Sequence, residues 1–394
     1  MSEPVYILGA GMHPWGKWDD RDFTEYGVVA ARSALRDAGL DWRQIQLVAG
    51  ADTIRNGYPG FVAGATFAQK LGWTGVPVSS SYAACASGSQ ALQSARAQIL
   101  AGLCDVALVV GADKAPKGFF APVGGERKND PDWQRFHLIG ATNPVYFALL
   151  ARRRMALYGA TGEDFAAVKV KNARHGLNNP NARYRKETTV SDVLASNIVS
   201  DPLHLLEICA VSDGAAAIVL GSEAQARQRG GHLIEVAGCA IASGQFGDPS
   251  LRIPNVASAA NACTPHTSEV VGAVQRALAM AGVGPQDIDL LEMADNTAWH
   301  LLAWPELFGF YEAGQGDWML AQGELDIDGR CPLNPSGGFL SFGEATTAQG
   351  VLQVCELLWQ LRGQAQGHQV EGARLAMSAV LGLGANGASV ILKG

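Results

Sequence analysis

Apolar and polar positions alternate between strand-like and helix-like periods along the first hundred residues. The apolar run VYILGAG at 5–11 predicts a buried strand ending in a glycine turn, and the 3.6-residue spacing at 24–45 predicts an amphipathic helix closed by Gly39. IQLVAGAD at 45–52 and CDVALVVGAD at 104–113 are typical of further buried strands. Alternating strands and helices predict an α/β fold with a largely parallel sheet covered by helices on both faces.

The second half repeats this order of elements. LIEVAGCAIAS at 233–243 predicts a strand, TSEVVGAVQRALAMAGVGPQDI at 267–288 a helix, DLLEMAD at 289–295 a strand, and ASVILK at 388–393 a closing strand. We therefore expect two similar halves, 1–231 and 232–394. The stretch 114–200 is rich in aromatic residues, Pro and Asn, which predicts an inserted loop or lid lobe.

Composition narrows the class of protein without naming a reaction. With 394 residues, 48% hydrophobic residues and 17% charged residues, the chain can bury the cores of two domains. A net charge of −7 argues against nucleic acid as a partner. No apolar run approaches the ~20 residues that span a bilayer, and the N-terminal stretch lacks the features of a signal peptide, so we expect a cytoplasmic protein.

The seven cysteines are widely spaced, and none pairs with another Cys or a His at metal-ligand spacing. This spacing predicts neither a disulfide framework nor a metal site, and we expect no permanently bound cofactor.

One cysteine, Cys85, stands at a predicted strand-to-helix junction in SSSYAACASGSQALQSARAQIL. The positive end of a helix dipole stabilises a thiolate, so this position favours a nucleophile. Free Cys is also among the most commonly buried residue types, and a small core residue beside a helix explains the same pattern. Glu344, in the glycine-rich NPSGGFLSFGEATTAQG, is likewise either a partner of a helix dipole or an acid/base group in a cleft.

Taken together, these stretches resemble the thiolase superfamily, in its sterol-carrier-protein-type branch. CASGSQAL is similar to the nucleophile segment, NPSGG with SFGEATTAQG to the catalytic loop, SDGAAAIVL to the inter-domain strand and LGLGANGASVIL to the terminal loop and strand. The resemblance runs in order through nearly the whole chain. It implies a five-layered αβαβα fold of two pseudo-symmetric halves, a dimer, and a Cys nucleophile that takes up an acyl group from coenzyme A thioesters.

The chain departs from the family at the positions where the family usually carries a catalytic histidine. Where the loop usually reads Gly-His-Pro, this chain has Gly343-Glu344-Ala345, so a carboxylate stands where the thiol-activating His is expected. The segment 294–297 reads Ala-Asp-Asn-Thr, which leaves Asp295 or Asn296 as substitutes for the usual first-position side chain. The last loop offers Asn386 in place of a second Cys or His.

These departures resemble a branch that includes large subunits of aromatic acylsuccinyl-CoA thiolases and proteins of steroid side-chain degradation. The resemblance implies a thiolase-type C-acyltransferase for a bulky 3-oxoacyl-CoA, and leaves two alternatives: a retro-aldolase on a β-hydroxyacyl-CoA, or a non-catalytic acyl-CoA-binding subunit. It also implies a small OB-fold zinc-ribbon partner. The candidate catalytic residues are Cys85, Glu344, Asp295, Asn296 and Asn386, and the candidate contacts to coenzyme A are Gly343, Gly384, Gly387, Arg183, Arg185 and Lys186.

Overall fold

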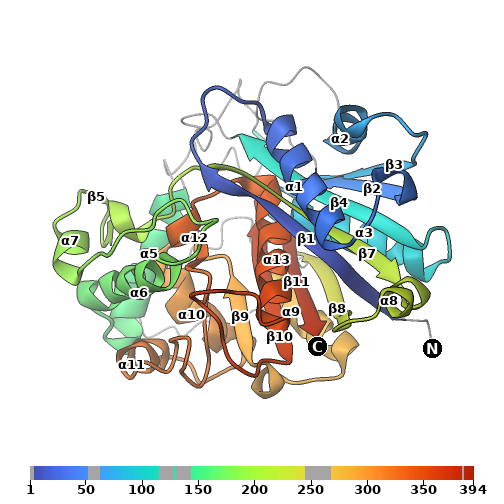
Figure 1. Cartoon of the computed structure of the whole chain (residues 1–394). Coiled ribbons are helices and arrows are strands. Elements are labelled where there is room, and N and C mark those ends of the chain that lie inside the picture. The colour runs from blue at the N-terminus through green and yellow to red at the C-terminus, as the bar shows by residue number, and fades with distance from the viewer. Residues whose placement is uncertain (1–3, 52–62, 115–127, 130–142, 245–267, 384–385) are drawn as a thin grey trace.

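The structure of the chain is a computed structural model that describes residues 4–51, 63–114, 128–129, 143–244, 268–383 and 386–394 (Figure 1). The described strands form one nine-stranded sheet in the order β3-β2-β4-β7-β1-β8-β11-β10-β9. Its N-terminal part consists of β1 (Val5–Gly16), β2 (Leu47–Ala51), β3 (Val78–Ser81), β4 (Val106–Lys114) and β7 (Asp213–Ser222). Its C-terminal part consists of β8 (Ile234–Ser243), β9 (Leu290–Met293), β10 (Leu375–Gly382) and β11 (Asn386–Lys393).

The two parts of the sheet have matching strand orders about their junction. Outward from the junction, β1, β7, β4 and β2 correspond to β8, β11, β10 and β9. The junction itself is short, since β1 and β8 pair only at Tyr6↔Glu235 and Ile7↔Ile234. This order confirms the two pseudo-symmetric halves expected from the repeated pattern.

The sheet is mixed, so the prediction of a largely parallel sheet is wrong. β2 pairs in parallel with β3 and β4, and β9 with β10, but β7 and β11 run antiparallel to both of their neighbours. For β11 the physical reason is connectivity: only three residues separate the end of β10 from the start of β11, and so short a connection can join only antiparallel strands.

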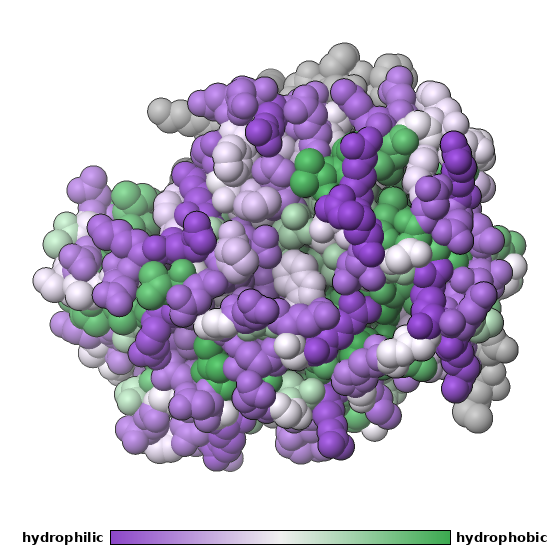
Figure 2. Space-filling view, in the orientation of Figure 1, coloured by the Kyte–Doolittle hydropathy of each residue, from purple (hydrophilic) through white to green (hydrophobic). Residues whose placement is uncertain are grey.

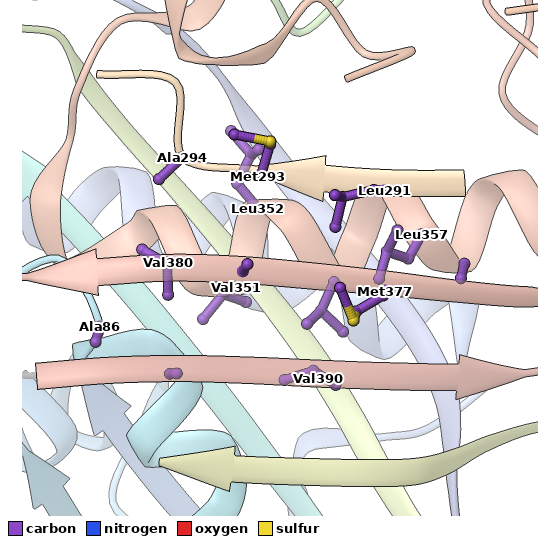
Figure 3. Packing of buried hydrophobic residues seen from close by; sticks show 14 of the residues in the cluster. Ala86, Leu291, Met293, Ala294, Val351, Leu352, Leu357, Met377, Val380 and Val390 are labelled. Atoms are coloured by element: carbon purple, nitrogen blue, oxygen red, sulfur yellow. The ribbon is translucent and has the colours of Figure 1, made fainter. Parts of the chain in front are cut away.

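Helices build five layers with the two parts of the sheet. The outer helices are α1 (Phe23–Asp37), α2 (Ala63–Leu71) and α8 (Glu223–Arg229) on the N-terminal part, and α9 (Glu269–Ala281) on the C-terminal part. The central layer consists of α3 (Ser87–Leu100) and α13 (Gln349–Leu361), which pack on each other and on strands of both parts. Figure 3 shows Val351, Leu352 and Leu357 of α13 among buried residues of β9 and β10 that include Met293, Met377 and Val380.

The first strand does not end at a glycine turn as predicted. β1 continues to Gly16, and Gly9 and Gly11 lie within it because α1 passes directly above. A Cβ added at Gly11 would lie 2.4 Å from the carbonyl oxygen of Ala30 and the amide nitrogen of Ala34. These glycines therefore permit close packing of strand and helix, which gives them a different role from a turn.

The insertion 114–200 contains three helices and a short strand where the structure describes it. It contains α5 (Asn143–Tyr158), α6 (Gly162–Gly176), α7 (Val190–Leu194) and, with the residues that follow, the two-stranded ribbon β5 (Ile198–Ser200) and β6 (Leu203–His204). In Figure 1 this lobe lies beside α10 (Ala298–Phe308), α11 (Gly316–Ala321) and α12 (Gly338–Phe342). Thr161 begins α6 with a capping box to Asp164.

Polar residues cover most of the face drawn in Figure 2, with apolar residues in scattered groups. Among the described residues, no helix combines the length and the apolar character needed to cross a membrane.

Candidate active site

Cys85 lies in a sharp turn between β3 and α3, two residues before the helix begins. The turn places Ala84 in the left-handed region at φ +49°, an unusual conformation for a residue with a Cβ. The Ser87 hydroxyl donates to the carbonyl oxygen of Ala84 at 2.6 Å and accepts from the amide of Ala83 at 2.9 Å. The hydroxyl thus holds the turn, which keeps the Cys85 side chain, 4% exposed, at the N-terminal end of α3.

Glu344 faces Cys85 from the other half of the chain. The Cys85 Sγ lies 3.1 Å from Glu344 Oε1, within hydrogen-bond reach of a thiol donor. Asn296 Nδ2 donates to the same oxygen at 3.3 Å, and Cys209 Sγ lies 3.7 Å from the other oxygen, Oε2. Glu344 is 2% exposed, so one buried carboxylate is shared by two thiols and an amide.

The backbone of Glu344 is fixed by the segment that leads into β7. Its amide donates to the carbonyl oxygen of Ala210 at 2.7 Å, and its carbonyl accepts from the amide of Ser212 at 2.9 Å. Gly343 precedes it at φ +79°, and a Cβ there would lie 2.2 Å from the Ser212 hydroxyl. Gly343 is therefore required by a left-handed turn and a close approach.

Asp295 anchors the loop that carries Glu344. Its carboxylate accepts from the amides of Phe339 and Leu340 at 2.6 and 3.2 Å, and from Asn172 Nδ2 at 2.6 Å. Burial raises the pKa of Asp295 to about 7, although the two amides oppose this shift. All three donors occupy its oxygens, so the contacts give Asp295 a positioning role at the N-terminal end of α12.

Two buried lysines of α6 hold the same loop. Lys169 Nζ donates to the carbonyl oxygen of Leu340 at 2.7 Å, and Lys171 Nζ donates to that of Leu333 at 2.5 Å. Burial lowers the pKa of both lysines to about 8, while the charge of Asp295 acts in the opposite direction. The loop from 333 to 344 therefore rests on charged side chains of the inserted lobe.

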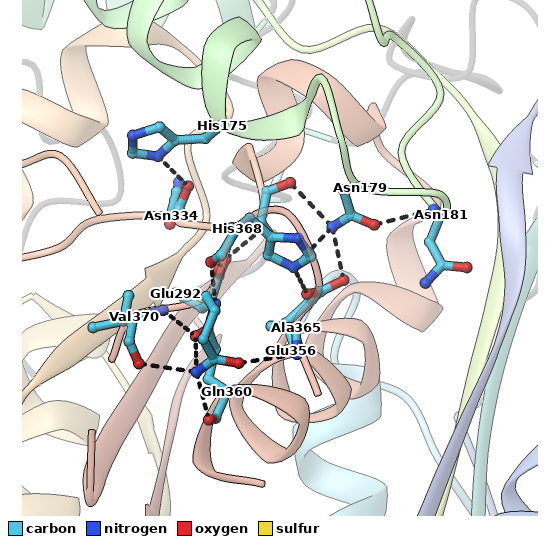
Figure 4. Close-up of polar contacts among 12 residues, drawn as sticks. His175, Asn179, Asn181, Glu292, Asn334, Glu356, Gln360, Ala365, His368 and Val370 are labelled. Carbon is cyan, nitrogen blue, oxygen red and sulfur yellow. Dashed lines mark hydrogen bonds and ion pairs between the residues drawn. The ribbon is translucent and has the colours of Figure 1, made fainter. Parts of the chain in front are cut away.

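A second group of buried polar side chains supports the start of this loop (Figure 4). Glu292 accepts from the amide and the hydroxyl of Ser336 at 2.9 and 2.8 Å. Burial, and then the charge of Glu356, raise the pKa of Glu292 to about 8. Glu356 in turn lies 2.9 Å from His368 Nε2 and accepts from Asn179 Nδ2 at 3.1 Å.

Apart from the basic run, the remaining candidates for catalysis and for contacts with coenzyme A lie at the start of β11 or just before it in the sequence. Asn386 begins β11 and donates to the carbonyl oxygen of Leu383 at 3.0 Å, while Gly384 lies outside the described residues. Gly387 packs on α9: a Cβ there would lie 2.2 Å from the carbonyl oxygen of Glu269. The end of β10 does approach the cysteine turn, since a Cβ at Gly382 would lie 2.0 Å from the carbonyl oxygen of Ala83.

The basic run consists of one partly buried arginine, Arg183, and two exposed side chains, Arg185 and Lys186. Arg183 Nη1 donates to the carbonyl oxygen of Val211 at 2.6 Å and to the Ser212 hydroxyl at 3.0 Å, which fixes the segment that holds Glu344. Arg185 and Lys186 are exposed and are thus accessible to an anionic ligand.

Sequence reasoning missed two functional features of this site. Cys209 was counted only as one of seven cysteines, although its position three residues before Ser212 brings it to Glu344. The support from α6 was also missed. His300 is buried in α10, where its Nδ1 accepts from the amide of Thr297 at 3.1 Å.

No group of His, Cys, Asp and Glu side chains within the described ranges could hold a metal ion. The arrangement offers instead a thiol, a proton acceptor at hydrogen-bond distance and a helix N-terminus, which are the parts of a nucleophilic acyl-transfer site.

Fold and site together define a thiolase-like acyl-transfer protein, and the comparisons with known families agree. The thiolase N-terminal domain matches residues 5–224, and the thiolase C-terminal domain-like family matches residues 255–394. The chain belongs to the thiolase family.

Relatives include an acetyl-CoA acetyltransferase of Methanothermobacter thermautotrophicus, 32% identical over 96% of each chain. Benzoylsuccinyl-CoA thiolase subunit BbsB of Thauera aromatica is 32% identical over 98% of this chain and 96% of its own. Bovine sterol carrier protein 2 is 31% identical over 96% of this chain and 70% of its own. These relatives confirm the resemblance to the sterol-carrier-protein-type branch.

Among solved structures, one titled Ltp2-ChsH2(DUF35) aldolase has a TM-score of 0.80 at 25% identity, over 99% of this chain and 98% of that chain. Human mitochondrial 3-ketoacyl-CoA thiolase in complex with CoA has a TM-score of 0.71 at 17% identity, over 100% and 98% of the two chains. Both likenesses confirm the thiolase fold.

Proposed function

We propose that this chain is a thiolase-type acyl-CoA C-acyltransferase that cleaves or forms the C–C bond of a bulky 3-oxoacyl-CoA. Cys85 is the nucleophile and Glu344 the proton acceptor. The observation that supports this most directly is the 3.1 Å contact between Cys85 Sγ and Glu344 Oε1 at the start of a buried helix. A carboxylate at this distance can receive the thiol proton as the sulfur attacks a carbonyl carbon.

The carboxylate of Glu344 can accept and return every proton that is transferred in the cleavage reaction. As Cys85 Sγ attacks the 3-oxo carbon, the thiol proton passes to Glu344. The bond between carbons 2 and 3 then breaks, its electron pair stays on carbon 2 as an enolate, and Glu344 returns the proton to that carbon. Glu344 next takes the proton of the coenzyme A thiol, whose sulfur attacks the acyl-enzyme, and gives it to the departing Cys85 sulfur.

The remaining residues position these two groups and the substrate. Asn296 Nδ2, at 3.3 Å from Glu344 Oε1, orients the carboxylate and assists proton transfer. Gly384 and Asn386 belong to the loop that shapes the thioester site, since the preceding strand end at Gly382 packs against the Cys85 turn. Arg185 and Lys186 are exposed basic groups for the phosphates of coenzyme A.

Two relatives favour a bulky acyl group over a short one. BbsB is named for benzoylsuccinyl-CoA, and the branch includes sterol carrier protein 2. We therefore place the substrate among aromatic, branched or steroid-like acyl-CoA thioesters, in aromatic compound or lipid degradation in the cytoplasm.

We also propose two kinds of protein partner. A second copy of this chain pairs at β3, which has one strand neighbour among the described residues and lies beside a groove of about 710 Å³ between α3 and α9. A small OB-fold zinc-ribbon protein is the second partner, because BbsB is named as a subunit and the Ltp2 structure includes ChsH2(DUF35). Sedimentation of the purified chain at several concentrations tests the first.

A retro-aldolase is the second candidate function, and the Ltp2-ChsH2 aldolase structure favours it. In that reaction Glu344 removes the hydroxyl proton of a β-hydroxyacyl-CoA, the C–C bond breaks, an aldehyde or ketone leaves and the enolate is protonated. Cys85 forms no bond in this route.

The two reactions differ in whether the acyl group becomes attached to the chain. The test is intact-mass spectrometry after incubation with aromatic, branched and steroid-like acyl-CoA thioesters, and with their β-hydroxy counterparts. The proteins compared are wild type, Cys85→Ala and the matched control Cys104→Ala, a buried cysteine that follows α3.

An added mass equal to the acyl group, present in wild type and Cys104→Ala but absent from Cys85→Ala, supports the acyltransferase. Release of an aldehyde or ketone by all three proteins without an adduct supports the retro-aldolase. Binding without either product, repeated with the zinc-ribbon partner, supports a non-catalytic subunit and overturns both enzyme assignments.

A further inference from the structure

The second oxygen of Glu344 faces a second buried thiol. Cys209 Sγ lies 3.7 Å from Oε2, on the side of the carboxylate away from the Oε1 that contacts Cys85. Asn296 Nδ2 lies 3.8 Å from the same sulfur and 3.3 Å from Oε1, so the amide connects the thiol to the carboxylate. Three side chains therefore surround one acid/base group.

The position of Cys209 is set by backbone hydrogen bonds. Its amide donates to the carbonyl oxygen of Asn296 at 3.0 Å, and the neighbouring Ile208 forms a β-bridge with Thr297. Three residues later, Ser212 donates its amide to the carbonyl oxygen of Glu344. The same short segment thus fixes both the thiol and the backbone of the carboxylate that it contacts.

The chemical state of this thiol follows from its surroundings. Burial, and then the charge of Glu344, raise the pKa of Cys209 well above its usual value. The sulfur accordingly stays protonated at neutral pH and can donate its hydrogen to Oε2. No helix begins at Cys209, which precedes β7, so it lacks the helix N-terminus that Cys85 has.

A donor on Oε2 has two effects on Glu344. It stabilises the ionised carboxylate, since hydrogen bonds to a charged acceptor favour the charged form. It also fixes the rotation of the carboxylate, which leaves Oε1 directed at Cys85.

We propose that Cys209 is a positioning residue that keeps Glu344 ionised and aligned to receive the proton of Cys85. This inference rests on the proposed role of Glu344 as the proton acceptor. It adds a specific function for a thiol that forms no bond to substrate.

The test measures the rate at which iodoacetamide alkylates Cys85 as a function of pH, followed by peptide mapping, in the whole chain without substrate. Wild type is compared with Cys209→Ala, with Cys209→Ser, which keeps a hydrogen-bond donor, and with the control Cys104→Ala. Glu344→Gln identifies the part of the profile that depends on the carboxylate.

Loss of the donor raises the proton affinity of Glu344, so the Glu344-dependent rise in the rate moves to higher pH in Cys209→Ala. We expect a shift of roughly 0.5 to 1 pH unit, because a hydrogen bond to a charged group is stronger than one between neutral groups but a thiol is a weak donor. Cys209→Ser restores most of the wild-type midpoint, and Cys104→Ala leaves it unchanged. A purely structural role lowers the thermal midpoint without moving the pH midpoint.

The failures of the two proposals are distinguishable. If the alkylation rate of wild-type Cys85 shows no rise with pH that Glu344→Gln removes, the proposed role of Glu344 as the proton acceptor is wrong, and the inference fails with it. If that rise is present but Cys209→Ala and Cys209→Ser both superimpose on wild type, the inference alone is overturned. Alkylation of Cys209 as fast as that of Cys85 also overturns it, because it shows a reactive thiol rather than a protonated donor.

Discussion

Replacement of Glu344 by Gln is the sharpest test of the site, because it removes the proton acceptor while nearly preserving its shape. The Gln side chain keeps an acceptor for Cys85 Sγ and for Asn296 Nδ2, which lie 3.1 and 3.3 Å from Oε1 in the parent. The backbone bonds of residue 344 to Ala210 and Ser212 do not involve the carboxylate. The variant should therefore fold with a stability close to that of the parent.

The size of the expected defect follows from what the carboxylate does. General base catalysis contributes typically about 10²- to 10⁴-fold, which corresponds to about 2.7 to 5.4 kcal/mol of activation free energy. Since Glu344 takes a proton in both half-reactions, acylation and deacylation should slow together. Raising the pH toward the ordinary ionisation of a free thiol, near pH 8.5, should recover part of the acylation rate.

Single-turnover acylation, followed by intact mass on a rapid-quench time scale, measures this step without interference from product release. Glu223→Gln on the exposed helix α8, where the parent side chain pairs with Arg227, is the control for the charge change. An acylation rate within fivefold of wild type would show that another group accepts the thiol proton. The same result would remove the basis for treating the 3.1 Å contact as a catalytic pair.

Two further predictions concern stability. The pKa of Glu292 is raised by burial to about 8, so the folded protein retains a proton that the unfolded chain releases, and stability should fall as pH rises from about 4.5 to 8. Glu292→Gln should flatten this dependence, as measured by urea unfolding between pH 5.5 and 8.5; an unchanged slope contradicts the assignment. Arg154 is buried between Glu306 and Asp317, so Arg154→Ala should lower the free energy of unfolding by about 3 to 5 kcal/mol. Arg152 is exposed, and Arg152→Ala should lower it by no more than about 1 kcal/mol in the same assay.

The sequence predicted most of the fold because its regular elements have regular patterns. The strands predicted at 45–52, 104–113, 233–243, 289–295 and 388–393 lie within two residues of β2, β4, β8, β9 and β11, whereas α9 ends at Ala281, before the predicted end at 288. Gly39 ends the first helix at φ +63°. The predicted end of β1 was wrong because glycine occurs both in turns and where a helix packs closely on a strand. Periodicity alone does not separate a turn from a place where a helix lies directly above a strand, as α1 does above Gly11.

The proposed catalytic pair could be predicted only in part. Cys85 and Glu344 are 259 residues apart, and each was singled out by its local surroundings, but no local pattern gives the distance between them. Asp295 and Asn296 are adjacent in sequence yet face different partners, Asp295 toward α12 and Asn296 toward Glu344. Cys209 had no local signal, since its role depends on two segments that meet only in the folded chain.

Helix α6 escaped prediction for an instructive physical reason. Its buried face mixes apolar and polar side chains: Lys169, Lys171, Asn172 and His175, all less than 7% exposed, are buried beside Phe165, Val168 and Ala173, so polar residues interrupt the usual apolar stripe. A polar face can be buried only against groups that satisfy it, and here these are the backbone carbonyls of the loop 333–340 and the carboxylate of Asp295.

That polar contact changes what the inserted lobe does. A lid covers substrate through surfaces that open and close, whereas α6 binds the catalytic loop through buried charged hydrogen bonds whose loss is costly. The Lys171 bond fixes the loop before α12, and the Lys169 bond and the Ser341 hydroxyl, which donates to the carbonyl oxygen of Asn172 at 2.9 Å, fix α12 itself. Glu344 follows directly after this helix, so its distance to Cys85 depends on the lobe as well as on the two halves. The described part of the insertion is thus a structural support for the candidate site, and this role accounts for the buried lysines of α6.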